Sequence, residues 1–198
     1  MSSLTTKKLA HVITDLSAEL EISTLVETGT FEGRTTAWAA RNFEHVITVE
    51  IDADTRRATQ AKLSELQNIM FLEGCSRDVM PGAVAGLNGK KTCFWLDAHK
   101  GGGYFGSGDD CPLLEEIECV HALGDKAYVF IDDARGFLKP PPPPFDWRYW
   151  PSLSTVMAAL NAAPDPRYVM VVDDVIISVP AHAQNATRTA LWRHYPDL

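Results

Sequence analysis

Apolar residues recur along the chain with two alternating spacings. In residues 1–20 they lie three or four positions apart, which predicts an amphipathic N-terminal helix. The stripe consists of Leu9, Val12, Ile13, Leu16 and Leu20. Short apolar runs rich in β-branched and aromatic residues follow, and such runs are typical of buried strands. The runs occupy residues 24–28, 45–50, 68–72, 92–97 and 127–132.

Helical patterns separate these runs. They cover residues 34–42, 53–66, 77–87 and 112–123, and a further one covers 152–163. Asp52 or Asp54 is placed to cap the second of them, because an Asp side chain accepts hydrogen bonds from the first N–H groups of a helix. Alternating strands and helices predict an α/β fold with a mostly parallel sheet and helices on both faces.

The end of the chain departs from this alternation. Residues 168–172 and 175–179 are apolar runs separated only by Asp173 and Asp174. Two strands joined by two turn-forming residues indicate a β-hairpin, which would close one edge of the sheet in the antiparallel direction. No repeat or linker divides the chain. The sequence therefore predicts a single Rossmann-like domain over residues 1–198, with seven strands and a C-terminal antiparallel hairpin.

A proline-rich and aromatic segment is predicted as a loop over residues 136–151. Five prolines, Pro140 to Pro144, exclude both a helix and a central strand, so this part of the chain is expected to be extended and stiff. Four aromatic residues follow: Phe145, Trp147, Tyr149 and Trp150. Three roles stay open for the segment: a ligand for a proline-binding domain, a wall of an acceptor pocket, or a subunit contact in a homo-oligomer.

Length and charge limit the class of protein. A chain of 198 residues suffices for one hydrophobic core. Its net charge of -8 argues against a general nucleic-acid partner, which would need an excess of Lys and Arg. No apolar run reaches 18 residues, so no membrane partner is expected. The four cysteines show no CxxC pairing, which favours reduced thiols and a cytoplasmic location.

The loop VETGTFEGRTT, residues 26–36, follows the first strand and precedes the first helix of the sheet. In open α/β sheets this is a preferred ligand position. The loop matches neither the Walker phosphate loop nor the dinucleotide fingerprint. Glu27 and Glu32 would also repel a pyrophosphate. A purely structural role of Gly29 and Gly33 in a tight turn is the remaining alternative to a ligand.

S-adenosylmethionine fits such a loop, because it carries a cationic amino group and a sulfonium but no phosphate. A carboxylate at the strand end can pair with the ammonium, and helix N–H groups can bind the ligand carboxylate. The expected cofactor contacts in the loop are Glu27, Thr28, Gly29, Thr30, Phe31, Gly33 and Thr35. Glu50 follows 21 residues after Gly29, which suits a ribose contact. Ser76 would border the adenine, and Asp97 would contribute to the same site.

Three carboxylates end the fourth and fifth predicted strands. They belong to Asp97, Asp132 and Asp133. Clustered carboxylates need a cation or a shared proton, and oxygen ligands suit Mg²⁺ or another hard divalent cation. Such an ion could bind an acceptor hydroxyl and lower its pKa. The alternative is structural: one aspartate caps a segment while another pairs with Arg135 or Lys100.

Methyl transfer from a sulfonium depends mainly on positioning and on deprotonation of the acceptor. His99 is the predicted general base, with Lys100 behind it and Asp97 before it. The glycine-rich stretch Gly101–Asp110 follows directly and is interpreted either as a lid over the substrate or as a simple connection.

Several motifs carry a resemblance to a known family. E-T-G-T-F-E-G-R-T-T, then V-E-I-D, then a strand ending in L-D, and the final hairpin resemble class I S-adenosylmethionine-dependent methyltransferases over about residues 20–180. F-W-L-D-A-H-K-G-G-G and F-I-D-D-A-R are similar to divalent-metal-dependent O-methyltransferases of the catechol and macrocin types. The resemblance implies the seven-stranded sheet and cofactor contacts at Glu27, Gly29, Gly33 and Glu50. Catechol-type members usually have D-N where this chain has Asp132-Asp133.

Together these features predict an S-adenosylmethionine-dependent O-methyltransferase that acts on a hydroxyl of a small molecule, a sugar or an aromatic compound, with a divalent cation. Two other hypotheses stay open: a non-catalytic nucleoside-binding module, and a metal-dependent hydrolase on the same fold.

Overall fold

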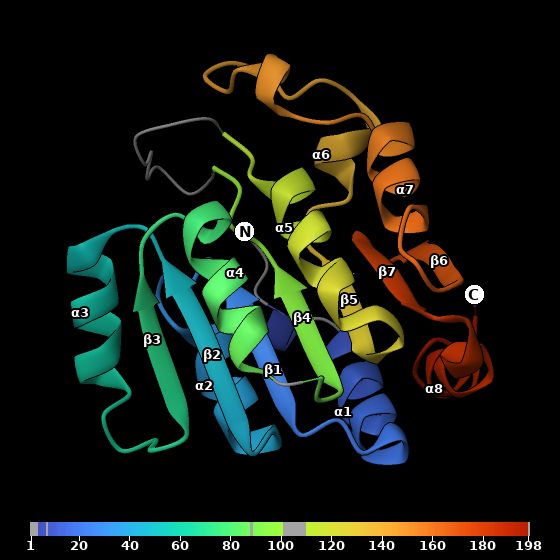
Figure 1. Cartoon of the computed structure of the whole chain (residues 1–198), viewed down its shortest axis with the longest axis horizontal. Helices are drawn as coiled ribbons and strands as arrows, with labels where there is room; N and C mark the ends of the chain where they lie inside the picture. Colours follow the sequence, from blue (N-terminus) through green and yellow to red (C-terminus); the bar gives the residue numbers. More distant parts are fainter. Residues whose placement is uncertain (1–3, 7, 88, 101–109, 198) are drawn as a thin grey trace.

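The computed structural model describes residues 4–6, 8–87, 89–100 and 110–197 of the chain. It contains a seven-stranded sheet of order β3-β2-β1-β4-β5-β7-β6, with helices on both faces (Figure 1). The first five strands of this order are parallel, and β7 is antiparallel to both of its neighbours. The predicted fold class is therefore confirmed, including the C-terminal hairpin.

The strands agree with the predicted apolar runs to within one residue. They are β1 Thr24–Thr28, β2 His45–Glu50, β3 Ile69–Glu73, β4 Thr92–Leu96, β5 Ala127–Ile131, β6 Arg167–Val172 and β7 Val175–Pro180. The α-helices are α1 Leu9–Leu20, α2 Arg34–Asn42, α3 Ala53–Lys62, α4 Ser76–Gly86, α5 Leu113–Val120, α6 Arg135–Leu138, α7 Leu153–Asn161 and α8 Gln184–His194. The 3-10 helices are η1 Leu4–Thr6, η2 His121–Lys126, η3 Trp147–Tyr149 and η4 Ala181–Ala183.

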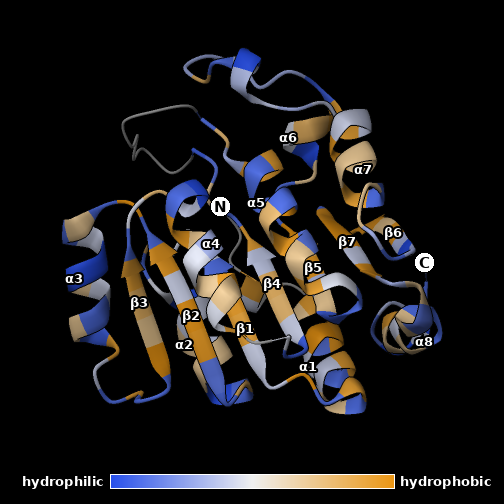
Figure 2. Cartoon of the chain, viewed as in Figure 1, coloured by the Kyte–Doolittle hydropathy of each residue, from blue (hydrophilic) through white to orange (hydrophobic). Residues whose placement is uncertain are grey.

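Successive residues of the central strands enter two different cores. Leu25 and Tyr128 pack on one face with α1, α2 and α8, whereas Val26 and Val129 pack on the other with α4, α5 and α7. This alternation follows from the strand geometry, which points neighbouring side chains to opposite faces. Because both faces are covered, β1, β4, β5 and β7 are buried along their whole length. Strand β7 appears mainly in the hydrophobic colour in Figure 2.

The carboxyl ends of the parallel strands meet at one edge, which lies at the top of Figure 1. Strand β1 lies between β2 and β4. The chain runs outward from β1 to β2 and β3, and it then returns to the other side of β1 to form β4. This is the switch point at which open α/β sheets bind ligands. Backbone hydrogen bonds extend the ladder past the strand ends: Asp97 N donates to Thr28 O and Asp132 N donates to Leu96 O, both at 3.1 Å.

The hairpin turn of β6 and β7 has the predicted two residues. Asp173 and Asp174 have φ angles of 49° and 65°, as a type I′ turn requires. Asp174 also holds the neighbouring segment, since its Oδ1 accepts a hydrogen bond from Arg135 N at 2.7 Å and its carbonyl accepts one from Ala134 N. The turn therefore positions the chain that follows β5.

The C-terminal helix α8 was not predicted from the sequence. Its residues include Asn, Thr and His, which are weak helix formers. Tertiary contacts stabilise it instead: Ala190 and Leu191 pack in the core beside α1, and Asp15 of α1 accepts hydrogen bonds from Arg193 and from His194.

The boundaries of other elements differ where turns compete with helices. Helix α3 ends at Lys62 and not at residue 66, and α5 ends at Val120 and continues as η2. Asp52 is the cap of α3, because its Oδ1 accepts a hydrogen bond from Thr55 N at 2.7 Å. Within the segment 136–151, which was predicted as an extended loop, α6 and η3 form short helical turns on either side of the prolines.

Among the described residues, no helix combines the length and the apolar character that crossing a membrane requires.

Gly29 is expected to tolerate no side chain. Its φ is +86°, and an added Cβ would lie 2.5 Å from the carbonyl oxygen of Asp97. We predict that Gly29→Ala lowers the free energy of unfolding by about 2–4 kcal/mol, from backbone strain and overlap together. Gly82→Ala is the matched control, because nothing lies within 4 Å of its Cβ position. It should gain about 0.5–1 kcal/mol of helix stability. Urea denaturation of both variants measures this, and equal stabilities would contradict the packing described for Gly29.

Candidate active site

The two glycines of the first loop are required by contacts within the protein. Gly29 lies against the backbone of Asp97, and a Cβ on Gly33 would meet Thr59 at 2.4 Å and Leu63 at 3.0 Å on α3. Both glycines have positive φ angles, of 86° and 71°, which glycine adopts without strain. The glycines thus bring the loop close to β4 and α3, and through this packing they fix the position of its backbone at the edge.

Glu27 is buried at the end of β1, with a side chain that is 1% exposed. Its Oε2 accepts hydrogen bonds from Thr36 at 2.5 Å and from Thr48 at 2.8 Å. Burial raises the pKa of Glu27 to about 7, against the opposing effect of the two hydroxyls. An uncompensated negative charge at this position is therefore costly, and a nearby cationic group would favour the ionised form.

Glu50 at the end of β2 holds the loop from the other side. Its Oε2 accepts a hydrogen bond from Phe31 N at 2.8 Å, and its Oε1 accepts one from Asp52 N at 3.0 Å. The Phe31 backbone has a φ of 45°, so it is a non-glycine residue in the left-handed region, where strain is expected. Its side chain is 46% exposed. The sequence did not predict this exposed aromatic ring.

The remaining predicted cofactor residues also lie at this edge of the sheet. Thr28, Thr30, Thr35 and Ser76 are all buried. Thr30 and Thr48 share a hydrogen bond of 2.6 Å between their hydroxyls, and Thr28 Oγ1 accepts one from Asp97 N at 3.2 Å. Ser76 begins α4, and its hydroxyl has no hydrogen-bond partner among the described residues. The hydroxyl lies close enough to Glu116 to oppose the rise in the pKa of that carboxyl.

Asp97, His99 and Asp133 lie together beyond β4 and β5. His99 Nε2 is 3.3 Å from Asp97 Oδ1 and 3.5 Å from Asp133 Oδ2. One ligand atom from each of the three residues lies within 4.8 Å of the others, so that the group could hold a metal ion. The sequence predicted this meeting of carboxylates from two strand ends, but it assigned His99 only to proton transfer.

Asp132 has a different position from its neighbour. It is 2% exposed, and its Oδ1 accepts a hydrogen bond from Asp133 N at 2.8 Å. Asp133 has a φ of 55°, and its Oδ1 contacts Arg135 at 2.7 Å. The ion pair that the sequence raised as an alternative to metal binding is thus present at Asp133, but it occupies only one of its two oxygens.

An aromatic cluster covers His99. The ring centroid of Trp150 lies 5.1 Å from that of His99, and Phe137 and Phe145 pack against Trp150 at 5.6 and 5.9 Å. Burial lowers the pKa of His99, although Asp133 and Asp132 act in the opposite direction. The imidazole is therefore neutral near pH 7 and keeps an unprotonated nitrogen.

Lys100 is tied to Asp110, which the sequence assigned to a flexible loop. Lys100 Nζ donates a hydrogen bond to Asp110 Oδ1 at 2.8 Å, and Asp110 Oδ2 accepts one from Asp146 N at 2.6 Å. Asp110 is 3% exposed. It thereby joins the end of β4 to the aromatic segment and brings that segment to the site. The rest of the predicted lid, residues 101–109, lies outside the described residues.

Solved structures of known proteins share this architecture. An O-methyltransferase from Streptomyces achromogenes, TomG, in complex with S-adenosylmethionine, has a TM-score of 0.63 at 17% identity and matches 91% of this chain and 81% of its own. The Podospora anserina methyltransferase PaMTH1, bound to S-adenosylhomocysteine, has a TM-score of 0.62 at 17% identity, with 90% and 78% covered. A Bacillus cereus O-methyltransferase has a TM-score of 0.59 at 16% identity, with 90% and 81% covered.

This chain has the fold of the S-adenosylmethionine-dependent O-methyltransferases. No family model matches the sequence, and no curated protein matches it either. At such low identity the likeness shows the fold, and the chemistry has to be argued from the residues of this chain.

Glu116 is a buried carboxyl of this methyltransferase fold that the sequence did not reveal. It lies on α5, is 2% exposed, and its Oε1 has no hydrogen-bond partner among the described residues. Burial raises the pKa of Glu116 to about 7, against the effect of nearby Ser76 and Thr28. In the sequence, Glu116 belongs to a run of acidic residues that is typical of a solvent-exposed helix face. Only the packing of α4 against α5 shows that its side chain is buried.

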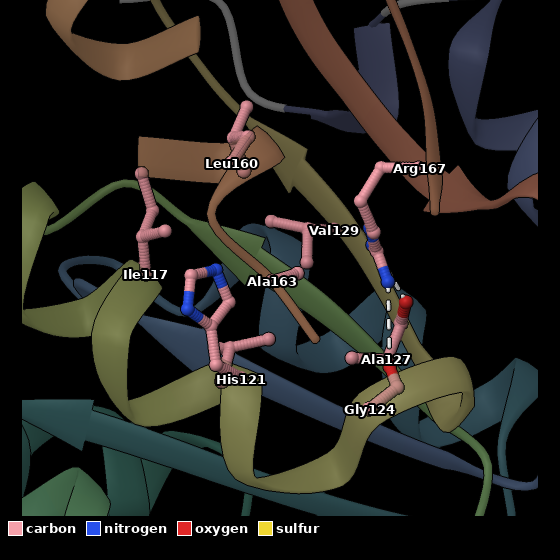
Figure 3. Close-up of a pocket in the computed structure, with 9 residues that line it drawn as sticks. Ile117, His121, Gly124, Ala127, Val129, Leu160, Ala163 and Arg167 are labelled. Carbon is pink, nitrogen blue, oxygen red and sulfur yellow. Dashed lines mark hydrogen bonds between the residues drawn. The ribbon is translucent and has the colours of Figure 1, made fainter. Parts of the chain in front are cut away.

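A small pocket lies at the opposite end of the methyltransferase fold, where β5 and β6 begin (Figure 3). Arg167 lies beside it and donates hydrogen bonds to the carbonyls of Gly124, Ala127 and Ser178. The pocket holds little more than a single water molecule. It is far too small for a nucleoside.

Glu116 makes the stability of the protein depend on pH. Its pKa rises from 4.5 to about 7 on folding, so the folded state binds this proton more tightly and stability falls as the pH rises between these values. Each pKa unit corresponds to 1.36 kcal/mol. We therefore predict that Glu116→Gln is more stable than the parent at pH 8, by up to about 3 kcal/mol, with little difference at pH 4.5.

Thermal unfolding between pH 4.5 and 8 measures this difference. Glu118→Gln is the matched control, because Glu118 lies on the exposed side of the same helix. It should follow the parent at every pH. If the difference in stability between Glu116→Gln and the parent were the same at every pH, the result would contradict the prediction. Ionisation of Glu116 would then carry no free-energy cost in the folded protein.

Proposed function

We propose that this chain is an S-adenosylmethionine-dependent methyltransferase that methylates a hydroxyl of a small molecule. The observation that carries the proposal is the arrangement of two different groups at one edge of the sheet. Glu27 of β1 and Glu50 at the end of β2 lie on either side of the first loop, and the cluster of Asp97, His99 and Asp133 lies beyond the adjacent β4 and β5. A cofactor and an acceptor could therefore meet between them.

The residues of the loop fit a cationic nucleoside. Glu27 offers a buried carboxyl whose ionised form a ligand ammonium would stabilise. Gly33 is the N-cap of α2, and no side chain caps the first N–H groups of this helix. Such a helix end can receive a carboxylate. Glu50 is placed to accept hydrogen bonds from ribose hydroxyls, and Ser76 at the start of α4 would border the base. These residues are among the cofactor residues predicted from the sequence.

Bound S-adenosylmethionine would supply an activated methyl group on its sulfonium. The chain itself then has to orient the acceptor and receive its proton. Neutral His99 keeps a lone pair that suits either a proton or a cation. Lys100 is paired with Asp110 at 2.8 Å, so we assign Lys100 to positioning of the segment around the acceptor.

The acidic residues fit a divalent cation. Asp97 and Asp133 each face His99 with one oxygen, and Asp132 orients the Asp133 backbone. A cation held there would lower the pKa of an acceptor hydroxyl. Aromatic side chains beside carboxylates suit an acceptor with both an apolar face and hydroxyls, and a sugar and an aromatic alcohol both meet this description.

Binding of S-adenosylhomocysteine tests the cofactor site without the need for an acceptor. We predict that calorimetry detects binding to the parent protein and that Glu27→Gln weakens it by about 10- to 100-fold, because a charge-assisted hydrogen bond contributes about 1.5–3 kcal/mol. Glu32→Gln is the matched control. Glu32 lies in the same loop but is paired with Arg34 at the exposed surface, so its variant should bind like the parent.

Absence of binding at millimolar S-adenosylhomocysteine would reject the methyltransferase proposal. An equal loss in both Glu variants would show that Glu27 does not face the ligand. A non-catalytic nucleoside-binding module would bind the same ligand, but Asp97→Asn and His99→Ala would then leave its biological activity intact.

A further inference from the structure

We propose that Asp97, His99 and Asp133 form a mixed nitrogen and oxygen site for a divalent first-row transition ion, with His99 Nε2 as a direct ligand. This differs from the three-aspartate magnesium site that the sequence predicted, because the imidazole takes the place given there to Asp132. The inference deepens the proposed function by naming the ion class and its ligands, and it rests on that function only for the role of the ion.

The separations of the donor atoms suit coordination better than hydrogen bonding. Bonds of about 2.0–2.2 Å at angles between those of an octahedron and a tetrahedron place neighbouring ligand atoms about 3.0–3.5 Å apart. His99 Nε2 lies 3.3 Å from Asp97 Oδ1 and 3.5 Å from Asp133 Oδ2. Nε2 makes no hydrogen bond to either carboxylate, and it has no other hydrogen-bond partner among the described residues.

The burial of His99 makes this lack of partners informative. Its side chain is only 5% exposed, and buried polar groups are normally satisfied by protein or water. Leaving an imidazole nitrogen unsatisfied costs about 1–3 kcal/mol. A ligand between His99 and the two carboxylates would remove this cost. It would also offset the repulsion between the Asp97 and Asp133 carboxylates, which come from adjacent strands.

The surroundings hold the three donors in place. Arg135 contacts Asp133 Oδ1, so that Oδ2 is the oxygen facing His99. The N–H of Asp133 donates to Asp132 Oδ1, which fixes its unusual backbone. The Trp150 ring packs on the imidazole. Outer contacts of this kind orient metal ligands and raise affinity, and they give Asp132 a supporting role rather than a coordinating one.

The donor set favours a transition ion over Mg²⁺. Magnesium and calcium prefer oxygen ligands alone, whereas imidazole suits manganese, iron, cobalt and zinc increasingly well. One imidazole with two carboxylates is thus better matched to Mn²⁺ or a later divalent ion. In this arrangement the lone pair of His99 holds the ion, and the pKa of a coordinated acceptor hydroxyl is lowered by the ion rather than by the imidazole.

Pulsed electron paramagnetic resonance of the Mn²⁺-loaded protein tests the assignment without any activity measurement. Directly coordinated imidazole gives a nitrogen modulation in the spectrum. We expect this modulation in the parent, its loss in His99→Gln, and its retention in His45→Gln, because His45 is an exposed residue at the start of β2. Asp132→Asn should also retain it, since Asp132 is not assigned as a ligand.

Titration of the same proteins measures affinity. Mn²⁺ should bind the parent at least about 10-fold more tightly than Mg²⁺, and His99→Gln should weaken Mn²⁺ binding by about 10- to 100-fold. Bound Mn²⁺ without nitrogen modulation in the parent would overturn the inference, as would no Mn²⁺ binding at millimolar concentration. If either happened while S-adenosylhomocysteine still bound, only the metal site would be rejected. Mn²⁺ binding without S-adenosylhomocysteine binding would reject the proposed function instead.

Discussion

The contact between Gly29 and the backbone of Asp97 links the two halves of the candidate site. The Gly29 position leaves no room for a side chain, since a Cβ would lie 2.5 Å from the Asp97 carbonyl oxygen. The Asp97 N–H in turn donates to Thr28 O. Because β1 and β4 meet in this way, the loop after β1 and the acidic group after β4 are adjacent. Every chemical role proposed above depends on that adjacency.

Buried carboxyls are the second feature of this region. Glu27 and Glu116 both have pKa values raised to about 7 by burial, and they lie on opposite sides of the strand ends. The protein thus keeps costly groups where a smaller or apolar residue would be more stable. Such a loss of stability is common at binding sites, because a complementary ligand stabilises the same buried groups when it binds.

The strands and the hairpin could be predicted from the sequence because buried strands form continuous apolar runs and the turn has two aspartates. The alignment of Glu27, Glu50, Asp97 and Asp133 at one edge followed from the parallel sheet. Helix α8 could not be predicted, since its stability comes from α1 rather than from its own residues. The burial of Glu116 and the contact of Lys100 with Asp110 could not be predicted either, because they depend on side-chain packing between distant segments.

His99 is a residue whose position could be predicted from the sequence but whose contacts could not. From the sequence it is a loop histidine beside an aspartate, which favours proton transfer. The burial of its Nε2 without a hydrogen-bond partner and the distances of this atom to two carboxylates are properties of the folded chain, and they favour coordination.

The most direct test of the central claim is a crystal structure of the protein with S-adenosylhomocysteine. The account predicts the ligand across the carboxyl ends of β1 and β2, with its amino group near Glu27, its ribose on Glu50 and its sulfur toward Asp97 and His99. A ligand bound elsewhere, or a site in which Glu50 contacts only the protein backbone, would contradict it.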